Sequence, residues 1–262
     1  VRKARASSVG DESEYTFLHL LVRDVAYGQI PRGARVEKHR RAAEWIESLG
    51  RPDEHAETRA YHYLSALELA RASRQPTEEL ANRARHALRE AGDRAAALNA
   101  FDPAARSYAS ALELWPADDP ERPRLLLSYG TMLALGQESG EEILEEAASA
   151  LVELGDRELA ARAELLLADS DWRAGQRDAA DAHLERAVNL VKGVPNSPAK
   201  ATVLSEVSRY HMLGDRFDDA IEIGRQALEM ATELGLDEVR AHALNNIGAS
   251  RTNAGDLDGI RD

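Results

Sequence analysis

The sequence predicts an all-α protein, a right-handed solenoid of paired helices with a short β-hairpin at its N-terminus. Composition is the first reason: Ala, Leu, Glu and Arg dominate the 262 residues and only 5% are aromatic, a bias that favours helix over sheet. The second reason is a repeat of small residues that starts near residue 85. The third is a change of pattern before residue 33, where a short stretch alternates as a strand does.

Residues 1–32 are predicted to be the end of a winged-helix domain, made of a hairpin and a short helix. Ser7–Asp11 has the composition of a turn, and Glu14–Leu18 has the alternation of a strand. A short helix is expected over Leu20–Gln29. A hairpin that leads into a helix is consistent with the end of such a domain.

Residues 33–84 are predicted to form helical hairpins that link this segment to the repeats. The first helix has an apolar stripe at helical spacing, made of Ala42, Ala43, Trp45, Ile46 and Leu49. Gly50–Asp53 then breaks the helix, and a second helix follows that carries His62 and several leucines.

Residues 85–262 are predicted to be repeats of two helices each. Two helices that cross closely need a small residue, and one recurs at spacings of 38, 38, 40 and 40 residues, at Gly92, Gly130, Ala168, Ser208 and Gly248. The second helices supply small residues that face these crossings or follow them, namely Ala104, Ala111, Ala150, Ala180, Ala187, Ala220 and Ala227. Turns with positive φ are expected at Gly136, Gly175, Gly214 and Gly255. The last repeat stops inside its second helix, so we expect a piece of a longer protein.

The repeats resemble the tetratricopeptide family over about Arg85 to Asp262. The clearest copies are Leu213-Gly214-Asp215 followed by Ala220, and Leu244 to Gly248 followed by Gly255-Asp256. The period exceeds the usual 34 residues of the family, as in the longer-repeat variants of large bacterial regulators. The resemblance implies a scaffold that binds a protein or peptide partner.

A second resemblance lies upstream, in Phe17 to Tyr27 with Arg35 and His39 after it. The stretch resembles the junction in signal-transduction ATPases with numerous domains (the STAND class), where a winged-helix domain ends and helical repeats follow. The similarity is to members of the adenylate/guanylate cyclase-like and transcription-regulator group, and the Arg-rich composition suggests an actinobacterial-like source. The resemblance implies an ATPase core elsewhere in the same protein, as an intramolecular partner of the repeats.

His19 matches, by this resemblance, the His of the Met-His-Asp-type sensor motif, which approaches the β-phosphate of bound ADP. An imidazole N–H donor suits a phosphate oxygen. The chain departs from the motif, because Phe17-Leu18 precedes the His and Leu20 follows it. The alternative interpretation is a packed His at the end of a strand.

No motif in the sequence predicts catalysis by this chain. It lacks the Gly-x-x-x-x-Gly-Lys-Ser/Thr loop that cradles nucleotide phosphates. It has no cysteine, and His55 and His62 lack the His-Glu-x-x-His spacing of zinc sites. We therefore predict no catalytic residue, no metal site and no cofactor, so that the chain is not an enzyme, although the longer protein that contains it can be an ATPase.

Charge is divided unevenly along the chain. The net charge is −13, with +1 in residues 1–60 (11 basic and 10 acidic residues) and −14 in the remainder (22 basic and 36 acidic). Acidic repeats repel phosphate backbones, which argues against nucleic acid as a partner of this chain. The basic run between Arg32 and Arg41 is interpreted as a solvated helix face or a surface for an acidic domain, with nucleic-acid contact as the alternative. No apolar run can span a bilayer and no signal-peptide core is present, which predicts a cytoplasmic location.

The concave surface of the last three repeats is the predicted partner-binding groove. Counting from the crossing residues, its outward positions are Trp172, Arg209, Met212, His242, Asn245, Asn246 and Asn253. Asn246 occupies the position at which peptide-binding family members hydrogen-bond an extended backbone, and an amide can both donate and accept. The alternative role for Asn246 is to tie adjacent helices together.

Two functions follow from these patterns. The first is a regulatory repeat arm that binds a protein or peptide and shifts a larger ATP-dependent signalling or transcription regulator between states. The second is a constitutive assembly scaffold without a switching role. The segment from Tyr15 to His39 favours the first, because a plain scaffold does not need it.

Overall fold

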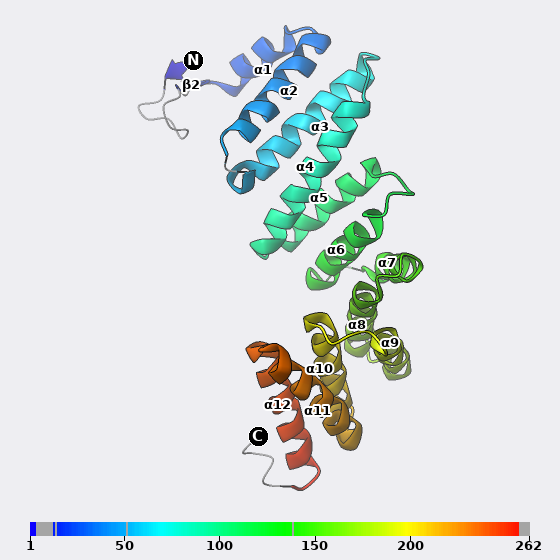
Figure 1. The fold of residues 1–262 in the computed structure, drawn as a ribbon. Helices are drawn as coiled ribbons and strands as arrows, with labels where there is room; N and C mark the ends of the chain where they lie inside the picture. The colour runs from blue at the N-terminus through cyan, green and yellow to red at the C-terminus, as the bar shows by residue number, and fades with distance from the viewer. Residues whose placement is uncertain (4–12, 14, 51, 138, 257–262) are drawn as a thin grey trace. The chain divides into compact units, whose positions relative to one another are not determined.

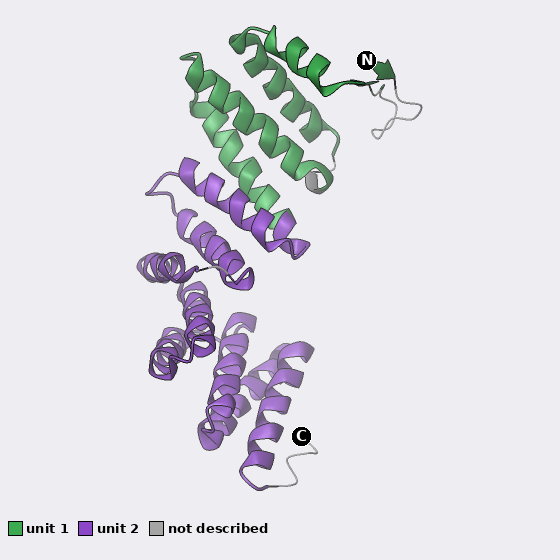
Figure 2. Ribbon diagram, turned by 180° about the vertical axis from the view of Figure 1, so that it is seen from behind, with its two compact units in different colours: residues 1–94 green, residues 95–262 purple. Residues whose placement is uncertain are grey.

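The computed structural model describes residues 1–3, 13, 15–50, 52–137 and 139–256 (Figure 1). Within them it contains twelve α-helices, one short 3-10 helix and one two-stranded sheet. The predicted fold class, an all-α repeat protein with a short β-hairpin at the N-terminus, is confirmed. The chain divides into two compact units, residues 1–94 and 95–262 (Figure 2).

The first unit begins with the hairpin. Strands β1 (Arg2–Lys3) and β2 (Tyr15–Thr16) pair antiparallel, with Arg2 opposite Thr16. The helices that follow are α1 (Leu20–Gly28), α2 (Arg32–Ser48), the 3-10 helix η1 (Pro52–His55), α3 (Ala56–Ala72) and α4 (Glu78–Ala97), whose last turn belongs to the second unit. Strand β2 and helix α1 lie within the predicted ranges Glu14–Leu18 and Leu20–Gln29, whereas the predicted turn Ser7–Asp11 lies outside the described residues.

The second unit is a succession of helical pairs. Its helices are α5 (Phe101–Leu114), α6 (Arg122–Leu135), α7 (Glu141–Glu153), α8 (Arg157–Arg173), α9 (Arg177–Val191), α10 (Pro198–Leu213), α11 (Phe217–Leu234) and α12 (Asp237–Asn253). Each pair buries a stripe of alanine and leucine, and one core cluster joins α8 to α12. The domain boundaries after residues 32 and 84 stay predictions, because the division into units follows compactness alone.

The predicted crossing residues are buried at helix contacts. Ala168 on α8 and Ser208 on α10 have no exposed surface. The Ser208 hydroxyl donates to the backbone oxygen of Ala220 on α11, 2.7 Å away. On α6, a methyl group added to Gly130 would stand 2.7 Å from the Leu144 side chain of α7. The small residues therefore allow the close approach for which the repeat frame requires them.

Two turn glycines differ from the prediction. Gly175 and Gly255 have positive φ, as expected. Gly136 and Gly214 instead end α6 and α10 with negative φ, and the left-handed residue comes one position later, at Gln137 and at Asp215. A side chain at Gly214 would stand 3.3 Å from the carbonyl oxygen of Tyr210 and 3.5 Å from the Trp172 ring. Close packing, not backbone conformation, accounts for glycine there.

Candidate partner-binding surface

The first helices of successive repeats form one continuous face in the second unit. Helix α8 contacts both α6 and α10, and α10 contacts α12. Trp172 lies on α8, Arg209 and Met212 lie on α10, and the four remaining predicted groove residues, His242, Asn245, Asn246 and Asn253, lie on α12. Their placement on neighbouring first helices is as expected, but their surroundings differ from one another.

Asn246 is not exposed, contrary to the expectation for a groove residue. Its side chain is 1% exposed. The amide nitrogen donates to the backbone oxygen of Ser205 on α10, 3.0 Å away. The structure therefore favours the alternative role, in which Asn246 ties α12 to α10. Asn245 and Asn253 remain exposed on the same helix.

Two neighbouring side chains partly cover the Trp172 ring. The Arg177 guanidinium stacks on it, 3.5 Å from the ring centroid. The Tyr210 ring packs against it edge-on, with 5.4 Å between centroids. Trp172 therefore fills the contact between α8 and α10 and offers only part of its surface to a ligand.

Arg209 and His242 belong to polar contacts on the open face. Arg209 donates to Glu206, 2.9 Å away, and stacks on the Tyr210 ring. Burial raises the pKa of the Tyr210 hydroxyl, which donates to Asp169 at 2.6 Å. His242 Nδ1 lies 2.9 Å from the hydroxyl oxygen of Ser205. Both Arg209 and His242 are half-exposed, so a partner can reach them.

A cleft of about 530 Å³ lies between α8 and α10. Its floor is apolar and its rim is charged; the lining residues are Glu158, Leu159, Arg162, Leu165, Leu166, Asp169, Ala199, Thr202, Val203, Glu206, Arg209 and Tyr210. Among the predicted groove residues, Arg209 alone lines this cleft. The remaining lining residues were not predicted from the sequence, although their spacing from the crossing residues could have identified them. Leu159, Arg162 and Leu166 stand nine, six and two residues before Ala168. Ala199, Thr202 and Glu206 stand at the same distances before Ser208.

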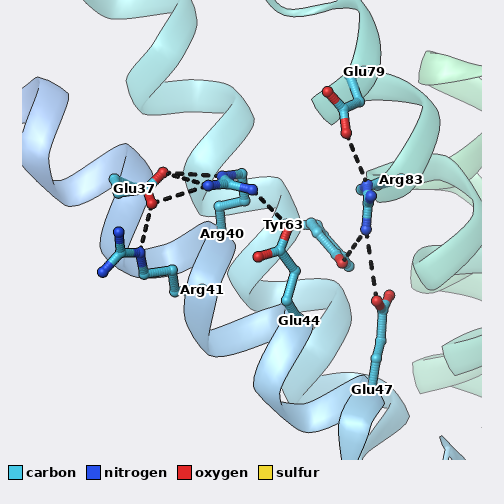
Figure 3. A network of polar contacts seen from close by, with 8 residues as sticks. All are labelled: Glu37, Arg40, Arg41, Glu44, Glu47, Tyr63, Glu79 and Arg83. Carbon is cyan, nitrogen blue, oxygen red and sulfur yellow. Dashed lines mark hydrogen bonds and ion pairs between the residues drawn. The ribbon is translucent and has the colours of Figure 1, made fainter.

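The C-terminal end of the basic run on α2 is neutralised within its own unit (Figure 3). Arg40 and Arg41 both donate to Glu37, and Arg40 also pairs with Glu44. These hydrogen bonds lower the pKa of Glu37, and the bond from Arg40 contributes most. The same figure shows Arg83 of α4 between Glu47 and Glu79. The arrangement favours a solvated helix face over a phosphate-binding one.

The segment that resembles the ATPase junction lies open to solvent. His19 precedes α1 and is exposed, so it does not pack against the described residues, and its sensor role stays a prediction. Helix α1 has no buried residue. The exposed apolar side chains from β2 to α1 are Tyr15, Phe17, Leu18, Leu20, Leu21, Val22, Val25 and Tyr27, and we call them the junction surface.

Neither a metal site nor a membrane span is found in the part of the chain that the structure describes. No three His, Asp or Glu side chains there are arranged to hold a metal ion. No helix there combines the length and the apolar character that crossing a bilayer requires.

Comparisons with known proteins support the repeat assignment. Residues 159–233, from α8 to α11, match the tetratricopeptide repeat family model. No curated protein shows significant sequence similarity to the chain. Among solved structures, BtubC (BKLC) from P. vanneervenii aligns with a TM-score of 0.58 and 18% identity over 86% of this chain and 87% of its own.

Two further structures share the fold. A STAND protein with a tetratricopeptide repeat sensor from Pyrococcus horikoshii aligns with a TM-score of 0.64 and 14% identity, over 92% of this chain and 37% of its own. A putative kinesin light chain from Podosopora anserina with nearly identical tetratricopeptide-like repeats aligns with a TM-score of 0.54 and 14% identity, over 67% of this chain and 89% of its own.

Residues 159–233 thus match tetratricopeptide repeats, and the chain is similar in fold to part of a STAND protein that has a tetratricopeptide repeat sensor. Repeats of this type serve as protein-interaction scaffolds and are generally non-catalytic. Their concave surfaces are extended and built from successive first helices. The cleft described above lies between two such first helices, α8 and α10.

Proposed function

We propose that this chain is the partner-binding arm of a larger ATP-dependent signalling or transcription regulator. The observation that carries the proposal is the junction surface. Leu20, Leu21 and Val25 of α1 are 67%, 78% and 61% exposed. Monomeric proteins rarely leave a contiguous apolar patch of this kind uncovered, because its exposure to water is unfavourable.

The chemistry of the junction surface fits a second protein domain. Its helix carries two charges, Arg23 and Asp24, which pair with each other at 2.8 Å. A neutral apolar surface suits the face of a folded domain and offers little to a phosphate backbone. The segment resembles the STAND junction, so we identify the covering domain as the ATPase core of the same protein. The likeness to the P. horikoshii protein supports this identification.

His19 stands at the edge of the junction surface and is exposed. With the core docked there, its imidazole would be available to contact a bound nucleotide, as the sensor role requires. The proposal therefore assigns His19 a function only in the complete protein.

The cleft between α8 and α10 is the proposed site for the external protein or peptide. Leu159, Leu166 and Val203 provide an apolar floor for side chains of an extended segment. Arg162 lies on its rim, is exposed, and makes no ion pair with the described residues. A carboxylate on the partner would complement it. Arg209 and His242 continue the same face toward α12.

The test uses the full-length protein encoded by the gene. The reading frame around this chain should first contain a Gly-x-x-x-x-Gly-Lys-Ser/Thr loop, and a frame without one ends the proposal. The double substitution Leu21→Ser and Val25→Ser should then change ATP hydrolysis or ADP retention at least several-fold. Nucleotide turnover and bound ADP are measured side by side in parent and variant.

A matched control makes the result specific. Val152 and Leu154 at the end of α7 are also exposed apolar residues, 49% and 45%. Replacing both by Ser should leave nucleotide handling as in the parent. If the junction variant behaves like this control, the chain is a constitutive scaffold and the regulatory role is wrong.

A further inference from the structure

We infer that Tyr27, His39 and His62 form a proton-dependent latch that fixes the orientation of α1 relative to α2 and α3. The inference deepens the proposed function, because α1 carries the junction surface. It concerns contacts inside the first unit alone, so it can be tested without the ATPase core.

Helix α1 is held to its unit almost entirely at its C-terminal end. None of its residues is buried, and its first two turns are open to solvent. The Tyr27 hydroxyl lies 2.8 Å from Nε2 of His39 on α2. Arg35 stacks on the Tyr27 ring at 4.6 Å and donates to the backbone oxygens of Gly28 and Ile30. Tyr27 is thus the side chain through which α1 is oriented.

His39 connects this contact to α3. It is 7% exposed, and its Nδ1 lies 2.9 Å from Nδ1 of His62. The two imidazole rings are 5.1 Å apart, and Tyr61 packs edge-on against both of them. A hydrogen-bonded chain therefore runs from α1 through α2 to α3.

Proton placement decides whether the chain can form. One of the two Nδ1 atoms must donate and the other must accept, so a single hydrogen lies between them. If His39 donates at Nδ1, its Nε2 accepts from Tyr27, or donates to Tyr27 once His39 is protonated. When both rings are cationic, two N–H groups point at each other, and the hydrogen bond between His39 and His62 is lost. The latch therefore tolerates one added proton and not two.

The surroundings do not offset this repulsion. Burial lowers the pKa of His39, and burial together with the neighbouring His39 lowers the pKa of His62. From α1, the group that faces the pair is Tyr27, with Arg35 of α2 stacked on it. From α3 it is Tyr61.

The other two neighbouring elements approach elsewhere. Helix α4 contacts α3 through Arg83 on Tyr63 and Glu90 on Arg59. Helix η1 begins thirteen residues beyond His39 and meets the far end of α2. None of these contacts supplies His39 or His62 with a carboxylate partner in the described part of the chain.

The sign of the pH effect follows from the lowered pKa values. Opening the latch returns both imidazoles toward the ordinary pKa of about 6.5, so the open form binds more protons below that pH. The latch is fully formed above a pH of about 6.5 and weakens as the pH falls below that value. Acidification should release α1, and with it the junction surface.

The experiment measures the position of α1 directly. The chain has no native cysteine, so Leu21→Cys on α1 and Ser48→Cys at the end of α2 can carry two spin labels in one unit. The label-to-label distance distribution should be narrow at about pH 7.5 and at least twofold broader at about pH 5, on either side of the ordinary histidine pKa. Tyr27→Phe should be broad at both pH values.

Two variants separate the latch from general loosening. Tyr61→Phe keeps its ring against both histidines and should behave as the parent. His62→Asn retains a hydrogen-bonding amide near the Nδ1 position but cannot be protonated, so its distribution should stay narrow at about pH 5. A narrow distribution for Tyr27→Phe, or the parent's broadening in His62→Asn, would overturn the latch. Either result leaves the ATPase-core proposal untouched, because no core is present in the measurement.

Discussion

The crossing of α6 with α7 and the crossing of α10 with α11 place their smallest residue on opposite helices. In the first crossing Gly130 of α6 receives the side chain of Leu144 from α7. In the second, α10 carries Ser208, and the glycine is Gly224 on α11, lodged between Ser208 and Ile247 of α12. Close approach therefore requires a small total volume at the contact, and either helix can supply the missing side chain.

The two crossings also differ in how many helices meet. Gly130 faces Leu144 and Ile143 of one partner helix. Gly224 faces α10 on one side and α12 on the other, with Ser208 Oγ and Ile247 Cγ1 both 2.8 Å from the place a methyl group would occupy. The second crossing thus joins a pair to the helix that follows it.

The largest expected effect is from Gly224→Leu. A side chain at this position must displace two helices at once, so we expect a loss of about 3 kcal/mol or more of unfolding free energy. Urea unfolding followed by circular dichroism measures it. A variant as stable as the parent would show that α11 and α12 are not packed as described.

Gly130→Leu should cost less, about 1–3 kcal/mol, because a single helix has to move. The same urea titration checks the order of the two variants. If Gly130→Leu is the more damaging of the two, the difference between the crossings has been misjudged.

Asn246→Ala tests a contact between repeats. The lost hydrogen bond to Ser205 is buried, so we expect a loss of about 1–2 kcal/mol. Asn245→Ala, at an exposed neighbouring position, is the matched control and should change stability by about 0.5 kcal/mol or less. Equal stability of the two variants would show that the Asn246 side chain is exposed, as the sequence predicted, and not buried against Ser205.

The sequence predicts the crossings because their small residues recur with the period of the repeat. Gly224 was missed, since the frame was set on first helices and one glycine in a second helix has no period to mark it. Asn246 was placed on the groove because it stands two residues before Gly248, the position at which peptide-binding family members hydrogen-bond an extended backbone. On α8 and α10 that position does line the cleft, as Leu166 and Glu206. On α12 the same position is buried against Ser205, and only the neighbouring helix decides that.

Ser208→Ala examines the polar component of the second crossing. The hydroxyl donates to Ala220, but the equivalent residue on α8 is already Ala168, which shows that an alanine fits a crossing of this type. We expect a loss of about 0.5–1 kcal/mol, the net value of one hydrogen bond, measured by urea unfolding. A loss above about 2 kcal/mol would mean that the hydroxyl, and not the small volume, determines this crossing.

The smallest effect is expected from Arg209→Ala, which lies one residue beyond the crossing and on the open face. Its ion pair with Glu206 is about one-third exposed on both sides, and such pairs contribute little, so the loss of stability should be about 0.5 kcal/mol or less. Binding should respond instead, because Arg209 lines the cleft between α8 and α10. Because the cleft is the proposed site for an external protein or peptide, an extended peptide that carries a carboxylate is the first ligand to titrate, with Arg94→Ala as a control substitution on α4. If Arg209→Ala lowers the unfolding free energy by clearly more than about 0.5 kcal/mol and leaves binding unchanged, Arg209 serves the packing of α10 and the cleft is not the site.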